Sequence, residues 1–186
     1  GCLDGPPQQP FTYFPARVTV DGQTLDPVGV RKKGFFGSLS DTKPSLKIKA
    51  EAYADDQAFS GLTRLTLNNN RQDPSHLDTC LAYTTFSAAG VPAPRCGYAR
   101  VTVNGAYLGV YSHVESMRKP FLRRHFADED GDLFEGTLSD FRPGWMGTFE
   151  VKTNDGEASS GDIEAVTEAL AVPDGALLPA LEAVLE

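Results

Sequence analysis

The feature that most constrains the fold is a short segment in which apolar and polar residues alternate strictly. Residues 45–50, SLKIKA, carry Leu46 and Ile48 at alternate positions, and Lys47 and Lys49 occupy the positions between and after them. Because successive side chains of a β-strand point to opposite faces, this spacing predicts a strand with one apolar face and one lysine-bearing face. The apolar face must be buried, so the segment predicts a packed sheet.

Similar segments recur along the chain and are separated by residues that favour turns. Asp21-Gly22 and Asn104-Gly105 are strong signals for tight hairpin turns, and each lies between two alternating segments. The pattern therefore predicts a mainly antiparallel sheet. The further strands are expected at residues 17–20, 28–33, 62–67, 98–103, 107–114, 133–136 and 149–152.

One helix interrupts the strands, and further helices follow them. Residues 75–89 are predicted to form an amphipathic helix with Asp73 as its N-cap, Pro74 in its first turn and Gly90 at its end. Its apolar positions recur at helical spacing, at Leu77, Cys80, Leu81, Thr84 and Ala88. Shorter helices are expected at residues 120–126, 162–170 and 176–185. The order predicts an α+β fold: an antiparallel sheet with one packed helix, followed by a short, mainly helical segment.

The stretch from residue 31 to residue 49 concentrates positive charge. It holds six of the chain's 17 lysines and arginines and only one acidic residue. Gly34 and Gly37 bracket two phenylalanines, and Ser38 follows them. A glycine-containing turn beside a lysine-bearing strand brings backbone N–H groups and ammonium groups to one anion. The alternative is a two-stranded ribbon with a solvated basic face.

Composition limits the possible partners and locations. The formal net charge is −8, and residues 128–186 contain 2 basic and 15 acidic residues, which argues against a nucleic-acid partner. No apolar run approaches the roughly 18 residues that a membrane span needs. The chain does not open with a signal peptide, so we expect any export signal to have been removed or to lie outside it.

The three cysteines bear on the redox compartment. Cys80 and Cys96 are 16 positions apart and flank a corner that contains Gly90, Pro92 and Pro94. A disulfide between them would place the protein outside the reducing cytosol. The alternative is a pair of buried free thiols. Cys2 is expected to be unpaired, and the absence of CxxC pairs or zinc-type histidine spacing predicts no metal-binding residues.

Seven ordered motifs lie between residues 17 and 135: GVRKKGFFGSL, KPSLKIK, GLTRLTLNNN, DPS, GVPAPRCGYARVTVNG, LGVYSHVE and FLRRHF. In this order they resemble the CotH family of spore-coat and secreted kinases. The resemblance implies a protein-kinase-like N-lobe, binding of ATP with a divalent metal (Mg or Mn), and transfer of phosphate to Ser/Thr of a protein substrate. It also implies a secreted or cell-surface location.

The resemblance assigns roles to individual residues. It places a glycine loop at residues 34–38, a phosphate-pairing lysine at Lys49 with Lys47 on the same face, and the lysine's acidic partner at Asp78. It also places at residues 115–117 the hinge whose backbone reads adenine; the alternative for the Glu115 side chain is to cap the helix at Pro120 or to satisfy the asparagine turn. The implied nucleotide-binding residues are Gly34, Gly37, Ser38, Lys47, Lys49, Asp78, Glu115 and Met117.

Departures from a complete kinase define the rival hypotheses. Asp78 is one carbon shorter than the usual Glu, and no H-R-D or D-F-G equivalent follows the hinge. We therefore expect a linker at residues 1–16, an N-lobe at 17–136, and a linker with the start of a truncated C-lobe at 137–186, inactive alone. The rivals are a non-catalytic adhesin or pseudokinase of the same fold and a secreted domain that binds small anions.

Two further patterns are interpreted without a catalytic role. Residues 128–132, DEDGD, resemble a calcium loop, but the twelfth position from Asp128 is Ser139 rather than a bidentate Glu. The segment is therefore predicted to be an acidic turn. The histidines at 76, 113 and 125 lie on different predicted elements and are not expected to share a site.

Overall fold

The computed structural model describes residue 5 and residues 10–154 and 156–185. The chain divides into two compact units: one is Gln9–Met117, and the other contains Arg118–Glu186. Cys2 and most of the predicted N-terminal linker lie outside the described residues. The predicted lobe boundary at residue 136 stays a prediction.

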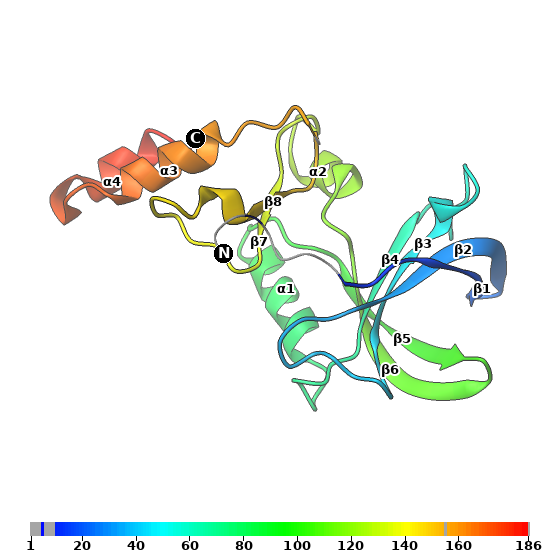
Figure 1. Ribbon diagram of the computed structural model, residues 1–186. Helices are drawn as coiled ribbons and strands as arrows, with labels where there is room; N and C mark the ends of the chain where they lie inside the picture. Colours follow the sequence, from blue (N-terminus) through cyan, green and yellow to red (C-terminus); the bar gives the residue numbers. More distant parts are fainter. Residues whose placement is uncertain (1–4, 6–9, 155, 186) are drawn as a thin grey trace. The chain divides into compact units, whose positions relative to one another are not determined.

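The first unit is built on a six-stranded antiparallel sheet (Figure 1). The strand order is β1-β2-β3-β4-β6-β5, so every neighbour except the β4–β6 pair is also a neighbour in sequence. The sheet confirms the predicted α+β class and the predicted strands. Its members are β1 (Phe14–Val20), β2 (Gln23–Lys33), β3 (Ser45–Lys49), β4 (Arg64–Asn68), β5 (Cys96–Val103) and β6 (Ala106–Val114).

The two predicted hairpin turns have the backbone that their residues favour. Asp21 and Gly22 join β1 to β2 with φ values of 47° and 85°, and Asn104 and Gly105 join β5 to β6 with values of 49° and 82°. Two successive positive φ values define the turn whose twist matches that of the flanking strands. Aspartate, asparagine and glycine tolerate this region, so the local sequence sets the register of both hairpins.

The core lies on one face of the curled sheet. Leu46 and Ile48 of β3 are 9% and 7% exposed, as their alternation predicts. They pack with apolar side chains from the other central strands, and each such side chain contributes about 1.5–3 kcal/mol when fully buried. The remaining buried members of this cluster are Val28, Ala50, Phe59, Leu65, Leu67 and Tyr111.

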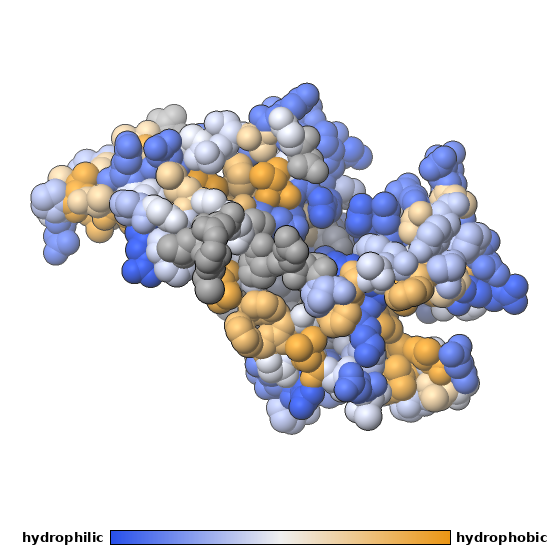
Figure 2. Space-filling model, in the orientation of Figure 1, coloured by the Kyte–Doolittle hydropathy of each residue, from blue (hydrophilic) through white to orange (hydrophobic). Residues whose placement is uncertain are grey.

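An apolar hollow of about 650 Å³ opens on this side of the sheet. Phe14 of β1, Leu46 of β3 and Val103 of β5 contribute to its lining, and apolar surface is visible over this part of the unit in Figure 2. Leu46 points away from the face that carries Lys47 and Lys49, because the strand alternates. The hollow and the lysine face are therefore on opposite sides of β3.

The helix of this unit, α1 (Asp78–Ala88), differs from the prediction in its start and its packing. It begins three residues later than expected, because His76 has a φ of 62°, a left-handed conformation that a helix cannot contain. No α1 residue is buried, and Leu77 and Leu81 are 55% and 62% exposed. The predicted apolar stripe of this helix is therefore wrong as a core face: α1 packs beside β5 (Figure 1) with most of its surface open.

The second unit consists of short elements. Its helix α3 (Gly161–Leu170) buries Ile163, Thr167 and Ala169. Asp162 and Glu164 lie in the first turn of α3, where negative charge complements the helix dipole. Phe121 and Leu122 of α2 (Lys119–His125) are also buried. The elements are α2 (Lys119–His125), β7 (Phe134–Gly136) paired with β8 (Phe149–Val151), a 3-10 turn η2 (Met146–Thr148), α3 (Gly161–Leu170) and α4 (Asp174–Glu182).

Candidate functional site

The register of the sheet brings basic residues from neighbouring strands together. Lys47 of β3 lies opposite Arg31 of β2 and Thr66 of β4, and directly opposed residues of antiparallel strands share a face. Lys33 of β2 and Lys49 of β3 share this face. Because the strands are antiparallel, they lie on opposite sides of the Arg31–Lys47 pair, each two positions away. The predicted basic face therefore forms, with four cations on two adjacent strands.

Lys49 lies at the end of this face opposite Gly29, and Ala52 and Tyr13 lie close to that glycine. Its cross-strand neighbours are Gly29, which has no side chain, and Arg64, which repels it. Within the described part of the chain its ammonium has no ion pair, and the implied pair with Asp78 is not formed. Lys47, by contrast, has a partner within the protein. An uncommitted, half-buried ammonium is available to an anionic ligand.

Residues 34–43, which we call the glycine segment, connect β2 to β3, and residues 34–38 form a compact turn that we call the glycine turn. Gly34 and Gly37 have φ values of 146° and 74°, which side-chain-bearing residues rarely adopt. The Ser38 hydroxyl accepts the Phe35 N–H at 2.9 Å, and the Ser38 N–H donates to the Phe35 carbonyl at 3.1 Å. Two N–H groups of the turn are thus satisfied internally, and within the described part of the chain the N–H groups of Phe36 and Gly37 make no hydrogen bond.

The residues after β4 were predicted only as a turn, and they have a larger role. Asn68 accepts a hydrogen bond from the Lys33 ammonium at 2.7 Å and so orients this lysine on the basic face. Asn69 is 2% exposed and bonds to the glycine segment. A run of asparagines directly after a strand was the only sequence signal for these contacts, because their partners are 26 to 35 residues away.

The predicted hinge leaves β6 and is partly used by the fold. The Glu115 carboxylate accepts the Arg95 N–H at 2.9 Å, and the Glu115 N–H donates to the Arg95 carbonyl at 2.9 Å. Glu115 thus extends the β5–β6 pairing. The expected capping of the helix at Pro120 is wrong, because no side chain caps the N-terminus of α2 (Lys119–His125), whereas a contact with the asparagine turn stays a prediction. Ser116 is tied to β4 through its hydroxyl, 3.2 Å from that of Thr66, and Met117 is exposed.

The segment before α1 is organised by one carboxylate. Asp73 accepts the backbone N–H groups of Ser75, His76 and Asp78 and the Ser75 hydroxyl. The hydroxyl bond, followed by the backbone bonds, lowers the pKa of Asp73 because it stabilises the ionised form. The predicted N-cap at Asp73 is therefore wrong: Leu77 is the N-cap of α1, and Asp73 organises the turn that precedes the helix. Asp78, in the first turn of α1, keeps an exposed side chain.

The disulfide prediction is confirmed. Cys80 of α1 and Cys96 of β5 are bridged, with Cα atoms 5.2 Å apart. Because α1 buries no residue, this bond is its principal attachment to the sheet. The alternative of two buried free thiols is wrong.

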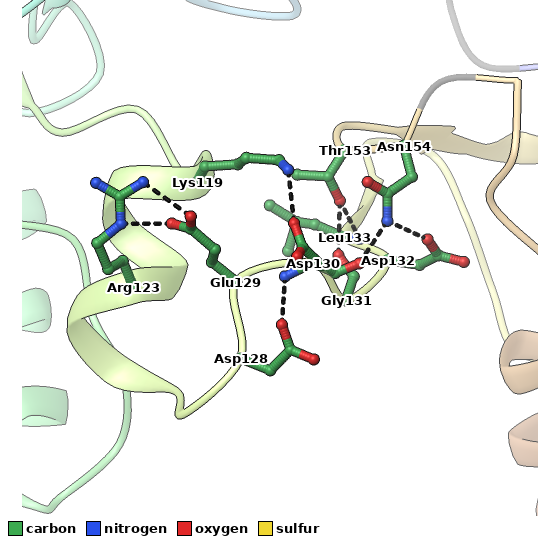
Figure 3. A network of polar contacts seen from close by, with 10 residues as sticks. All are labelled: Lys119, Arg123, Asp128, Glu129, Asp130, Gly131, Asp132, Leu133, Thr153 and Asn154. Atoms are coloured by element: carbon green, nitrogen blue, oxygen red, sulfur yellow. Dashed lines mark hydrogen bonds and ion pairs between the residues drawn. The ribbon is translucent and has the colours of Figure 1, made fainter.

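The acidic turn at residues 128–132 belongs to the second unit, and protein groups occupy its carboxylates (Figure 3). Asp130 forms an ion pair with Lys119 at 2.8 Å, which holds the pKa of Asp130 below its usual value. Asp132 accepts from the Asn154 amide at 2.8 Å, which lowers the pKa of Asp132. Glu129 accepts from Arg123 at 2.9 Å, and Asp128 accepts the Asp130 N–H. These contacts agree with a structural turn.

Burial shifts the pKa of two residues of β6: it raises the pKa of Tyr111 and lowers that of His113. His113 lies on β6 opposite Leu67, and desolvation lowers its pKa, with the nearby Glu115 charge acting in the opposite direction. The folded chain therefore binds this proton less readily than the unfolded chain does.

We accordingly expect protonation of His113 to have no effect on the free energy of unfolding well above pH 6.5, the ordinary histidine value. As the pH drops below this value, the free energy of unfolding should fall. The His113→Gln variant should lose less of its free energy of unfolding than the unchanged chain between about pH 7.5 and 5.5, a range in which carboxylates titrate little. Urea unfolding at several pH values tests this. An identical loss in the variant and the unchanged chain would show that His113 titrates alike in the folded and unfolded states.

The described residues contain no group of three or more His, Cys, Asp or Glu side chains arranged to hold a metal ion. They also contain no helix with the length and apolar character that crossing a bilayer requires.

Comparison with known proteins gives consistent matches. The model of the family described as CotH kinase protein matches residues 30–171. The inner spore coat protein H-like protein of Bacillus subtilis is 32% identical over 77 residues, 41% of this chain and 25% of that protein. The inner spore coat protein H of the same organism is 30% identical over 103 residues, 55% of this chain and 28% of that protein. The chain thus spans about a quarter of the length of the curated relatives it matches.

Proposed function

Because the chain belongs to the CotH kinase protein family, we propose that its parent protein transfers phosphate from ATP to serine or threonine side chains of a protein substrate. This chain contributes the nucleotide-binding part of that activity. The observation that carries the proposal is the basic face of β2 and β3, which holds Arg31, Lys33, Lys47 and Lys49 and continues from Lys33 into the glycine turn. Such a face neutralises the charge of ATP phosphates, and phosphoryl transfer depends mainly on positioning and charge neutralisation.

In this proposal, different residues of the chain contact the phosphates and the adenine of ATP. Lys49 pairs with the phosphates, because its ammonium has no partner in the described chain. The N–H groups of Phe36 and Gly37 face the phosphates from the turn. The Glu115 N–H is already donated to Arg95, so the adenine is read by the backbone of Ser116 and Met117.

A divalent ion, Mg or Mn, accompanies ATP in this proposal. Such an ion neutralises charge on the β- and γ-phosphates when bound. It requires several oxygen ligands, and the described residues offer no carboxylate group of that kind. We therefore assign no residue of this chain to the metal.

The proposed location is outside the reducing cytosol, on the cell surface, secreted, or in a spore coat. The Cys80–Cys96 disulfide supports an oxidising environment. Two Bacillus subtilis relatives are named as inner spore coat proteins, which supports a coat location. The protein substrate would then be another secreted or coat protein.

One observation favours a second candidate, a non-catalytic adhesin or pseudokinase of the same fold. An active kinase positions its phosphate lysine with an acidic residue of the neighbouring helix. Lys49 and Asp78 form no such pair within the described chain, and Asp78 is exposed. If this arrangement persists in the parent protein, the basic face binds an anion without catalysing transfer.

Labelled ATP distinguishes the candidates. We expect the parent protein with Mg or Mn to transfer γ-phosphate to protein serine or threonine, and the 186-residue chain to transfer none while retaining nucleotide binding. Transfer by the 186-residue chain would overturn the division of labour between this chain and the rest of the parent. Nucleotide binding without transfer by the parent would favour the pseudokinase, and equal competition by inorganic phosphate would favour a small-anion domain.

A further inference from the structure

The buried asparagine that follows β4 has an unusually complete set of hydrogen bonds. The Asn69 amide Nδ2 donates to the Ser38 carbonyl at 2.9 Å and to the Lys43 carbonyl at 2.8 Å. Its backbone N–H donates to the Ser45 hydroxyl at 2.9 Å, and its Oδ1 accepts the Arg71 N–H at 3.2 Å. Two carbonyls at one end and an N–H at the other define the orientation of the amide.

These bonds reach both ends of the segment that follows the glycine turn. Ser38 ends the turn and Lys43 precedes β3, so a single side chain fixes the separation of the two points. Only an amide places two donors in one plane at this reach. Leucine or aspartate has a similar shape but no donor.

Two neighbours of Asn69 contact the same segment. The Arg71 guanidinium donates to the Leu39 carbonyl. The Gln72 side chain packs against Gly37 so closely that a Cβ at position 37 would lie 2.2 Å from its nitrogen. We call Asn69, Arg71 and Gln72 the asparagine clamp. The clamp contacts this segment at residues 37, 38, 39 and 43, and it comes from residues distant in sequence.

The glycine segment has little else to hold it. Phe36 is 75% exposed and Leu39 is 51% exposed, so the segment buries few apolar groups. Its other contacts are a local bond from the Lys43 N–H to the Ser40 hydroxyl, an ion pair between Lys32 and Asp41 at 3.5 Å, and the Lys43 ammonium over the Tyr111 ring. Among the described residues, the clamp supplies the hydrogen bonds that reach this segment from distant parts of the sequence.

The clamp is also coupled to the basic face. Asn68 precedes Asn69 directly and orients Lys33, which lies opposite Ser45 where the segment joins the sheet. Successive residues at the end of β4 thus hold a cation and the glycine turn in one arrangement. A ligand that contacts both requires this arrangement before it binds.

We propose that Asn69 is a positioning residue that holds the glycine turn in place for the phosphates of a nucleotide. This inference rests on the proposed function. It predicts that Asn69 affects the affinity for phosphate groups and leaves the affinity for the nucleoside unchanged. A purely structural asparagine would affect both or neither.

The test compares Asn69→Asp with Asn104→Asp. Both changes add one negative charge, but Asn104 lies in an exposed hairpin turn that aspartate also tolerates. In the 186-residue chain, hydrogen exchange at residues 35–43 should rise by about tenfold in Asn69→Asp, because a carboxylate would face the Ser38 and Lys43 carbonyls. Exchange in β3 and β4 should stay within about twofold of the unchanged chain.

Affinity is measured in the parent protein with ATP and with adenosine. Asn69→Asp should weaken ATP binding by about tenfold and adenosine binding by less than about twofold, while Asn104→Asp changes neither. If Asn69→Asp does not fold, Gly37→Ala displaces the turn from the other side through Gln72 and should give the same pattern.

Each outcome decides between the alternatives. Unchanged exchange at residues 35–43 would overturn the clamp itself. If hydrogen exchange at residues 35–43 rises but the affinities for ATP and adenosine fall equally, Asn69 is structural and its positioning role is overturned. If the unchanged parent binds neither ligand, the proposed function fails and this role fails with it, whereas the exchange result still establishes whether Asn69 holds the turn.

Discussion

Replacing Lys49 by methionine in the parent protein should lower phosphate transfer by at least about tenfold, equivalent to roughly 1.4 kcal/mol of transition-state stabilisation. Methionine keeps most of the apolar stem and removes the charge. The loss is expected because the Lys49 ammonium has no ion pair within the described chain and is therefore available to a phosphate. Initial rates at saturating and limiting ATP measure it.

The matched control is Lys47→Met, two residues earlier on the same face. Lys47 already interacts with another group of the protein, so it is less available to a ligand and its removal should cost less activity. Thermal unfolding should change little in Lys49→Met, because the buried side of β3 carries Leu46 and Ile48. A large loss for Lys47→Met with an unaffected Lys49→Met would place the phosphate lysine at 47. Full activity in both would make the strand a solvated basic face.

Removal of the Cys80–Cys96 disulfide should lower the free energy of unfolding by about 3 kcal/mol, from the loop-entropy relation for a closed loop of this length. The effect should be concentrated at α1, which buries no residue and packs mainly beside β5. Urea unfolding of the Cys80→Ser, Cys96→Ser double variant measures the energy. Hydrogen exchange at residues 78–88 should rise more than exchange in the sheet.

Cys2→Ser is the control for cysteine content, and it leaves the bridge intact. Alkylation and peptide mapping without reductant should find Cys80 and Cys96 protected. Free alkylation of both residues in protein from an oxidising compartment would contradict the bridge. An unchanged urea midpoint in the double variant would show that the bridge does not constrain the unfolded chain.

The strands were predictable because their information is local. Alternation in residues 45–50 defined the two faces of β3, and turn pairs such as Asp21-Gly22 defined the hairpins. Backbone preferences and side-chain alternation act over a few residues, so they are expressed in the sequence itself. The disulfide was predictable for a related reason, since a short corner keeps Cys80 and Cys96 close.

The helix prediction failed where tertiary context decided. Leu77 and Leu81 have helical spacing, yet both are exposed, because α1 is attached at Cys80 and presents little of its surface to the sheet. Helical periodicity describes a face and does not say which surface covers it. The turn organised by Asp73 and His76 likewise delayed the start of the helix.

By itself the sequence determined the α+β class, the lysine face of β3, the hairpins and the kinship to a kinase family. Only the tertiary structure decided which residues hold these parts in place. Glu115 bonds to Arg95 across 20 positions, and Asn69 bonds to Ser38 across 31. Such contacts form when the sheet brings distant segments together, and a buried polar group takes whichever partner lies within reach there. For this reason the asparagine run was recognisable as a turn but not as the clamp of the glycine segment.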